Sequence, residues 1–210
     1  MSHKNHFFVF LILLSNVLYG EVTLADTEEP TKEWELLTSE SKIEFTGKQM
    51  GVPTSGSFSD FDTKIIFDQN NLDTSYVLVS VDLKSVETPY EILTKVVQTE
   101  DWFDIERYPK AVFESNNIKY KGNTEKYSFI AHGIISLRGI KGPIDFHFNI
   151  LPPSDLKQIE KENLKHVQGK LIMQRTLFGV GQGDWGDTSI VDDNVEIEVN
   201  FIVMEKQTSP

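Results

Sequence analysis

Cysteine is absent from this sequence of 210 residues. The chain therefore forms no disulfide, offers no thiolate to a zinc ion and has no thiol nucleophile. It also lacks the cysteine that is lipidated in bacterial lipoprotein anchors. If this chain is exported, it must be held together by packing and hydrogen bonding alone.

Positive charge is scarce. Lysine and arginine number 20 against 32 aspartates and glutamates, which gives a formal net charge of −12. A surface of this sign repels nucleic-acid phosphates and disfavours docking on anionic lipid headgroups. We therefore expect no nucleic-acid partner.

Long apolar runs are missing as well, and only a short one lies near the N-terminus. It covers residues 7–14, whereas a membrane-spanning helix needs roughly 20 apolar residues. The run follows a lysine and precedes small residues, which is the order found in secretory signal peptides. We predict a signal peptide rather than a membrane anchor, and hence a periplasmic or secreted protein that does not span the membrane.

The predicted cleavage site sets the bounds of the mature chain. Thr23 and Ala25 have the spacing of small residues before a cleavage site that follows Ala25, and Gly20 offers an alternative site. Residues 1–25 are then the signal peptide, residues 26–32 a polar leader and residues 33–206 one folded domain.

Two neighbouring segments alternate strictly between apolar and polar side chains. They run from Tyr127 to Leu137 and from Ile144 to Ile150. Because side chains along a strand point to opposite faces with period two, each segment is predicted to be a strand with one buried face. The glycine-bracketed connection over residues 138–142 predicts a hairpin between them.

The register of this hairpin is predicted by matching its two apolar faces. The match places Gly133 opposite Phe146 and Ile135 opposite Ile144, because a slip of one residue would turn one apolar face outward. The hairpin then presents one broad apolar wall that is rich in aromatic rings.

The rest of the mature chain shows short strands, turns and one helix. A helix is predicted over Pro89–Thr99, where Thr88 and Glu91 have the spacing of a capping box. The charged stretch Asp155–Lys165 is predicted to be a short surface helix or a loop. The pattern favours an antiparallel sandwich or barrel. A loop is predicted over residues 47–56, and further strands over residues 34–37 and 41–45 (one interrupted strand), 58–67, 76–83, 111–115, 167–178 and 195–203.

Motifs with a known chemistry are few. The literal Gly-x-Gly-x-x-Gly at residues 181–186 precedes no predicted helix, so a glycine-rich connection is favoured over a dinucleotide site. In the predicted register His132 opposes His147 on the outer face, with Asp145 nearby, but exposed polar residues are favoured over a metal site. The aspartates within residues 184–193 match no EF-hand loop. No catalytic residue and no metal ligand is predicted.

The interior of the predicted barrel has residues of mixed size. Eight antiparallel strands can enclose either packed side chains or one small ligand. The inward positions include the small Ala131 and Gly133 and the large Phe129 and Phe146. The inward residues lean to the barrel that holds a ligand, although side chains of mixed size can also interdigitate into a solid core, and composition alone does not separate the two. The aromatic residues between positions 102 and 108 are interpreted as core residues in preference to ligand contacts.

Short motifs follow one another in a characteristic order along residues 33–204. They are Trp34, Ser41-x-Ile43-x-Phe45, Gly56-x-Phe58, Val81-x-Leu83-x-Ser85-Val86-x-Thr88, Trp102-Phe103-Asp104, Tyr108-Pro109-x-Ala111-x-Phe113-x-Ser115, Gly133-x-Ile135-x-Leu137-Arg138-Gly139, Pro143-Ile144, Arg175-x-x-Phe178-Gly179-Val180-Gly181 and Val195-x-Ile197-x-Val199. In order and spacing they resemble the YceI family of exported, lipocalin-like proteins that bind polyisoprenoids. The charged stretch at residues 155–165 is longer than the family pattern requires.

The resemblance implies a mainly β fold, an extended eight-stranded antiparallel lipocalin-like barrel with one short helix near one end. It also implies a long apolar tunnel and often a homodimer. The implied activity is binding of a polyisoprenoid, an isoprenoid quinone or a similar long-chain amphiphile, with no catalysis and no other cofactor. From the inward-facing strand positions we predict the tunnel lining Phe45, Val79, Val81, Phe113, Phe129, Ala131, Phe146, Phe148, Leu171, Met173 and Phe201.

Two alternatives stay open on the sequence. An enzyme acting on a lipid would need a cluster of polar side chains inside the barrel. An interaction or stress-linked module without a bound lipid would show an exposed apolar patch larger than a few hundred Å².

Overall fold

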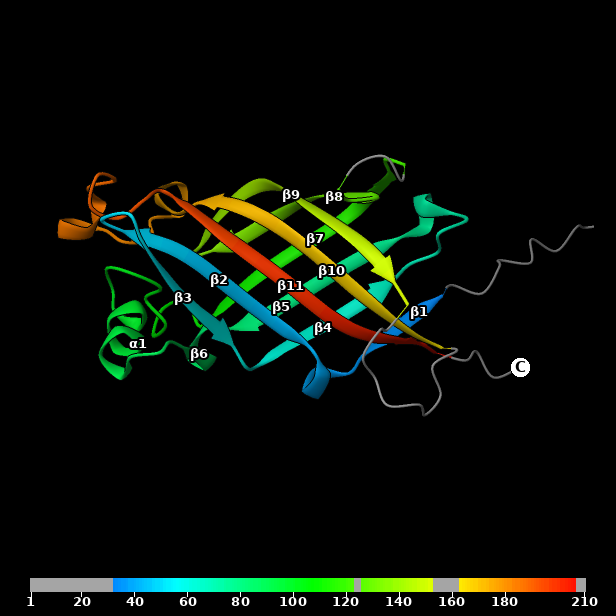
Figure 1. Cartoon of the computed structure of the whole chain (residues 1–210), viewed down its shortest axis with the longest axis horizontal. Helices are drawn as coiled ribbons and strands as arrows, with labels where there is room; N and C mark the ends of the chain where they lie inside the picture. Colours follow the sequence, from blue (N-terminus) through cyan, green and yellow to red (C-terminus); the bar gives the residue numbers. More distant parts are fainter. Residues whose placement is uncertain (1–31, 123–125, 153–162, 207–210) are drawn as a thin grey trace, which may run out of the picture.

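Strands with alternating inward and outward side chains form a sheet that closes into an antiparallel barrel in the computed structural model (Figure 1). The structure describes residues 32–122, 126–152 and 163–206. Within these residues, the predicted eight-stranded antiparallel barrel with one short helix is confirmed.

Eleven strand segments make up the eight barrel strands of the described chain, because three barrel strands are each broken into two segments. The broken ones are β1 with β2, β3 with β4, and β5 with β6, and each follows its neighbour around the barrel. The last strand, β11, pairs with both β1 and β2 and closes the ring. The segments are β1 (Glu33–Leu36), β2 (Lys42–Gln49), β3 (Val52–Phe58), β4 (Phe61–Ile66), β5 (Tyr76–Asp82), β6 (Val86–Glu87), β7 (Lys110–Tyr120), β8 (Phe129–Leu137), β9 (Ile140–Leu151), β10 (Leu164–Gln174) and β11 (Asn194–Glu205).

The break in the first barrel strand, which the sequence predicts, is confirmed. A 3₁₀ turn over Thr38–Glu40 separates β1 from β2. The hydroxyl of the buried Ser41 donates to the carbonyl of Leu37 at 2.8 Å and accepts from the backbone N–H of Ile202 at 3.0 Å. One side chain therefore replaces the ladder bonds that the break removes.

The β8–β9 hairpin forms, but the predicted register is wrong by two residues. Gly133 pairs with Ile144 and Ile135 pairs with Gly142. The cause is the turn, which is a two-residue connection of Arg138 (φ 51°) and Gly139 (φ 73°) rather than a loop over residues 138–142. Positive φ at both positions is the geometry of a type I′ turn. A shift of two residues keeps the same side chains inward, so the predicted inward face is retained.

The predicted loop over residues 47–56 is wrong, because these residues form most of the β2–β3 hairpin. The turn consists of Met50 (φ 50°) and Gly51 (φ 78°). A proline is tolerated in β3 because the strand pairs with β6 only at Ser57 and Phe58, which leaves Pro53 without a ladder partner on that side.

The helix α1 (Glu91–Gln98) lies beside one end of the barrel, close to β6 (Figure 1). It is shorter than the predicted Pro89–Thr99, and the predicted capping box does not form. Tyr90 is the N-cap residue, and the Thr88 hydroxyl instead donates to the carbonyl of Tyr90 at 2.9 Å. Among the described residues, no helix combines the length and the apolar character that crossing a bilayer requires.

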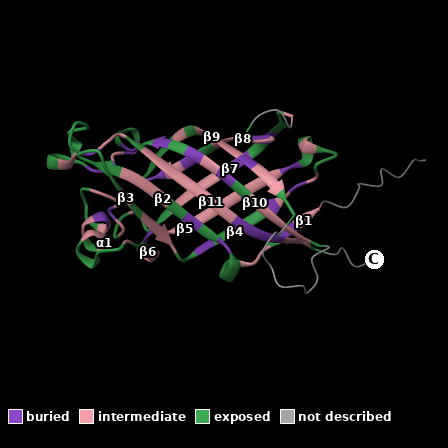
Figure 2. Cartoon of the chain, in the orientation of Figure 1, coloured by how far each residue is buried: buried purple, intermediate pink, exposed green. Residues whose placement is uncertain are grey.

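Buried residues lie mainly along the barrel strands, while the loops at both ends are largely exposed (Figure 2). The predicted signal peptide at residues 1–25 lies outside the described residues, as do nearly all of the predicted leader and most of the charged stretch Asp155–Lys165. Lys165, its last residue, belongs to β10.

Candidate functional site

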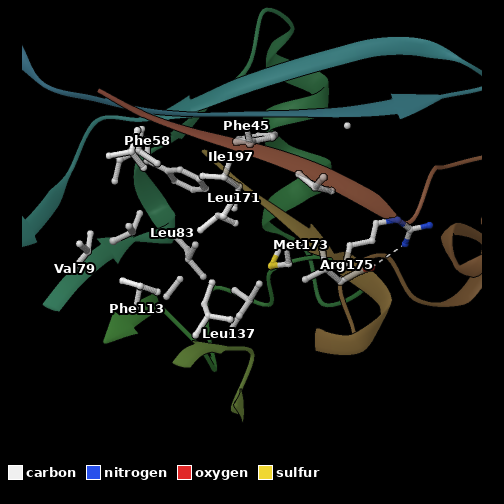
Figure 3. A pocket seen from close by; sticks show the side chains of 18 of the residues that line it. Phe45, Phe58, Val79, Leu83, Phe113, Leu137, Leu171, Met173, Arg175 and Ile197 are labelled. Carbon is white, nitrogen blue, oxygen red and sulfur yellow. Dashed lines mark hydrogen bonds between the residues drawn. The ribbon is translucent and has the colours of Figure 1, made fainter. Parts of the chain in front are cut away.

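A cavity of about 350 Å³ lies inside the barrel, and its lining is almost wholly apolar. Figure 3 shows side chains from several strands converging on it, among them Phe45, Val79 and Phe113. These three point inward and yet are only half-buried. Their accessible surface therefore faces the cavity, which identifies the interior as hollow rather than as a solid core.

Ten of the eleven predicted lining residues line this cavity. They come from β2, β5 and β7–β11, which place alternate side chains inward. That they contact a ligand stays a prediction. The ten are Phe45, Val79, Val81, Phe113, Ala131, Phe146, Phe148, Leu171, Met173 and Phe201.

Phe129, the eleventh, does not line the cavity. It is buried behind Phe148, and the two rings stack with centroids 5.3 Å apart. Phe129 lies at the start of β8, beyond the end of the cavity. Its inward direction was predicted correctly, but the depth of the cavity cannot be inferred from alternation along one strand.

Sequence reasoning missed lining residues outside the regular strands. Trp102 and Phe103, which were interpreted as core residues, line the cavity from the connection after α1. The ring of Phe103 lies 6.0 Å from that of Phe58. The apolar stripe of α1 also contributes, through Ile92 and Leu93. That stripe was the one available signal, because a helix with an apolar face needs a surface to cover.

Three phenylalanine rings of the lining lie against the backbone of a neighbouring strand. Phe45 lies over Gly56, Phe113 over Gly133, and Phe146 over Gly169. A Cβ atom built on any of these glycines would come within 3.0 Å of the ring. Each glycine thus provides the space that lets a ring lie along the wall instead of across the cavity.

Aromatic rings close the end of the cavity that lies away from α1. Trp34 contacts Phe67 with ring centroids 5.6 Å apart, and Phe67 contacts Phe148 at 6.3 Å. All three line the cavity and none is more than 7% exposed. We call Trp34, Phe67 and Phe148 the aromatic floor.

The opposite end of the cavity is open beside α1. There the lining includes the exposed Lys48 and Gln49 at the end of β2, and the half-buried Thr54 and Thr88. Ile92 of α1 lines the cavity and is 76% exposed. These residues form the mouth, which is the polar end of an otherwise apolar cavity.

Arg175 is the one fully buried charged side chain of the described lining. Its five N–H groups donate to five backbone carbonyls at 2.7–3.0 Å. Burial lowers the pKa of its guanidinium, an effect that the nearby Asp193 opposes. Because a guanidinium has five donors, none is left for a ligand. Arg175 (Figure 3) therefore holds the loop over residues 180–192 in place and does not bind a headgroup. The accepting carbonyls belong to Val180, Gly181, Trp185, Val191 and Asp192.

Of the polar residues considered for chemistry, Asp192 lines the cavity, whereas His132, Asp145 and His147 lie outside it. His132 opposes Asp145, and not His147 as predicted, with Nδ1 and Oδ1 2.7 Å apart. Across the described ranges, no three histidine, aspartate or glutamate side chains are grouped as metal ligands would be.

The glycine motif at residues 181–186 contains a 3₁₀ turn, Gly183–Gly186, and leads into further turns and β11, which confirms the interpretation as a connection. Of the described residues that line the cavity, none is a histidine, serine or glutamate.

A closed antiparallel barrel with an apolar interior cavity defines a protein of the lipocalin-like class. The family model of the YceI-like domain matches residues 34–203. The chain belongs to the YceI family, as its motifs indicate.

Curated relatives carry only a general designation. A UPF0312 protein of Photorhabdus laumondii is 34% identical over 89 residues, which cover 42% of this chain and 44% of the relative. A UPF0312 protein of Yersinia pestis is 33% identical over 103 residues, covering 49% and 52%. The matches thus span about half the length of these relatives.

Solved structures share the fold over most of the chain. BcnA of Burkholderia cenocepacia is 26% identical with a TM-score of 0.67, covering 80% of this chain and 99% of BcnA. A polyisoprenoid-binding domain of Saccharophagus degradans, implicated in plant cell wall breakdown, is 13% identical with a TM-score of 0.62, covering 83% and 99%. At 13% identity, the second likeness shows the fold alone.

Proposed function

We propose that this protein binds one long apolar molecule in the barrel cavity and carries it through water. The observation that carries the proposal is the cavity of about 350 Å³ with its almost wholly apolar lining. Burial of each methylene group is worth about 0.8 kcal/mol, so a hydrocarbon chain binds there without a polar contact. An isoprenoid lipid, an isoprenoid quinone or a similar long-chain amphiphile has this chemistry. The isoprenoid class is the one that the family resemblance implies, and the S. degradans barrel of the same fold is a polyisoprenoid-binding domain.

Binding is favoured over catalysis by the chemistry of the lining. Acid–base or nucleophilic catalysis on a lipid requires polar side chains within hydrogen-bond reach of the reacting atoms. In the described lining, the carboxylate of Asp192 and the polar side chains of the mouth stand at one end of the cavity, whereas apolar side chains form its walls. The mouth is therefore the place for a polar headgroup, with the apolar tail inside.

The test is to purify the chain from cells that express it with residues 1–25 intact, and to identify bound molecules by native mass spectrometry and solvent extraction. We expect a long-chain apolar ligand at a stoichiometry of one per barrel. Val79→Trp, which fills the cavity from β5, should abolish the bound mass. Leu78→Trp, whose side chain leaves the same strand on the other face, should retain it. A ligand-free wild-type protein that also takes up no prenyl alcohol or quinone would contradict the proposal.

We also propose that the carrier works outside the cytoplasm. The support is the predicted signal peptide at residues 1–25. Cell fractionation followed by N-terminal sequencing should find a mature chain that begins at Asp26, or at Glu21 if cleavage follows Gly20. A full-length chain in the cytoplasm would overturn this part. The homodimer that the family resemblance implies stays a prediction, which sedimentation of the purified chain would test.

A further inference from the structure

The two ends of the cavity differ in a way that gives a bound chain one direction. The mouth is exposed and partly polar, with Lys48, Thr54 and Ile92 in its lining. The other end is the aromatic floor of Trp34, Phe67 and Phe148, which are 7%, 3% and 5% exposed. An amphiphile therefore enters tail first, since the floor offers no hydration for a headgroup.

A second layer of rings supports the floor from behind. Phe129 stacks on Phe148 at 5.3 Å and meets Phe67 edge-on at 5.6 Å. Tyr120 packs against the far side of this layer, with its ring centroid 5.2 Å from that of Phe129. Rings packed in contact on both sides cannot swing aside to lengthen the cavity without losing that packing.

The volume of the cavity limits how much of a ligand is buried. About 350 Å³ is at the lower end of the roughly 300–1,000 Å³ found for small-molecule pockets. A long polyisoprenoid is larger than such a pocket, so part of its chain must remain outside the mouth. The number of buried carbons is then fixed by the distance from the mouth to the floor.

We propose that the aromatic floor, backed by Phe129, is a chain-length gauge: it sets how many carbons of an apolar tail the barrel buries. This inference rests on the proposed function. Affinity rises with each added carbon until the tail reaches the floor, and further carbons add nothing. Each buried methylene tightens binding about fourfold, so the break in the series is sharp.

The experiment measures Kd for a homologous series of prenyl alcohols that differ by one isoprene unit, through displacement of a fluorescent apolar probe. In the wild-type protein we expect Kd to fall steeply and then to become constant at one chain length. Phe129→Ala removes the support of the floor and should move the break to a longer alcohol by about one isoprene unit. Phe67→Leu, which lowers the floor itself, is the second variant if Phe129→Ala does not fold.

Phe178→Ala is the matched control. Phe178 has the same exposure as Phe129, 4%, and it also does not line the cavity. It packs in the separate core cluster with Leu137 and Met173. The control should lose stability, as any large-to-small core substitution does, and leave the break unchanged.

The outcomes separate this inference from the function on which it depends. A Kd that keeps falling along the whole series, or a break that neither floor variant moves, overturns the gauge and leaves the carrier intact. If Phe178→Ala moves the break as far as the floor variants do, the gauge is also overturned, because a general loosening of the core then explains the change in chain length. If no alcohol binds the wild-type protein, the proposed function fails and the gauge fails with it.

Discussion

The ring of Phe113 occupies the space above Gly133 in which any other residue would carry its side chain. Phe113 belongs to β7 and Gly133 to β8, which are neighbouring strands. This contact favours a hollow barrel, because a ring held against the wall leaves the centre open. The ring of Phe146 meets that of Phe113 at 6.3 Å and lies over Gly169 in the same way.

The first prediction is that Gly133→Ala is destabilising although alanine is small. The new Cβ would lie within 3.0 Å of both the Phe113 ring and the backbone carbonyl of Glu114. We expect a loss of about 1–3 kcal/mol in the free energy of unfolding, measured by urea denaturation, which is the usual cost of overpacking. Gly47→Ala is the control, because its Cβ would meet no atom nearer than 3.9 Å. Equal stability of the two variants would contradict the packing described.

Much of this barrel can be predicted from sequence because the alternation of apolar and polar residues shows which side chains of a strand point inward. Period-two alternation gives the inward positions of each strand, and ten of the eleven residues predicted from it line the cavity. Alternation does not report register, so Gly133 was assigned to Phe146 although it pairs with Ile144. The two-residue turn that decides the register depends on Arg138 adopting a positive φ, which is uncommon for a residue other than glycine.

The hollow interior is implied by the family resemblance and does not follow from composition or alternation alone. Whether mixed side chains fill a barrel depends on contacts between strands, such as the one between Phe113 and Gly133. The role of Arg175 is hidden for the same reason, since its partners are backbone carbonyls up to 17 residues away along the chain. Because every residue has a backbone carbonyl, the amino-acid sequence does not show which carbonyls accept from Arg175.

The second prediction concerns Arg175. Arg175→Met keeps an unbranched side chain but leaves five carbonyls without their donor. Since a buried polar group that loses its partner costs about 1–3 kcal/mol, we expect a loss of at least about 3 kcal/mol in the free energy of unfolding. Hydrogen exchange should rise over residues 179–192. Lys119→Met, at an exposed side chain of β7, should change stability by less than about 0.5 kcal/mol. A small effect at Arg175 would mean that the loop holds its shape without the guanidinium.

The third prediction is a dependence on pH at Asp187, which begins the turn before β11. One carboxylate oxygen accepts from the hydroxyl and from the backbone N–H of Ser189, at 2.7 and 2.8 Å. These bonds hold the pKa of Asp187 below its ordinary value, the hydroxyl having the larger effect. A carboxyl group with a lowered pKa stabilises the fold above its unfolded pKa, and the contribution is lost as the pH falls through the folded pKa. The turn should therefore loosen only in acid.

Carboxyl NMR titration of Ser189→Ala tests this assignment. The pKa of Asp187 should rise toward its ordinary value in the variant. Asp68 is the internal control, because its lowered pKa has another cause, the backbone N–H of Asn70 followed by Lys32. An unchanged pKa at Asp187, or a parallel change at Asp68, would show that the Ser189 hydroxyl is not the cause.

The fourth prediction concerns the route by which a ligand enters. Ile92 is 76% exposed and still lines the cavity at the mouth, so its side chain stands beside the opening without supporting the core. Ile92→Trp narrows the opening and leaves the buried part of the site unchanged. We expect association and dissociation of a fluorescent prenyl probe, followed by stopped flow, to slow by the same factor with Kd unchanged.

Leu177→Trp, at a residue that is 63% exposed and does not line the cavity, is the control and should alter neither rate. A fall in affinity at Ile92 without slower dissociation would mean that the side chain contacts the bound ligand. Unchanged rates would mean that the ligand enters by another path, and the direction of the chain inside the barrel would then have to be reversed or abandoned.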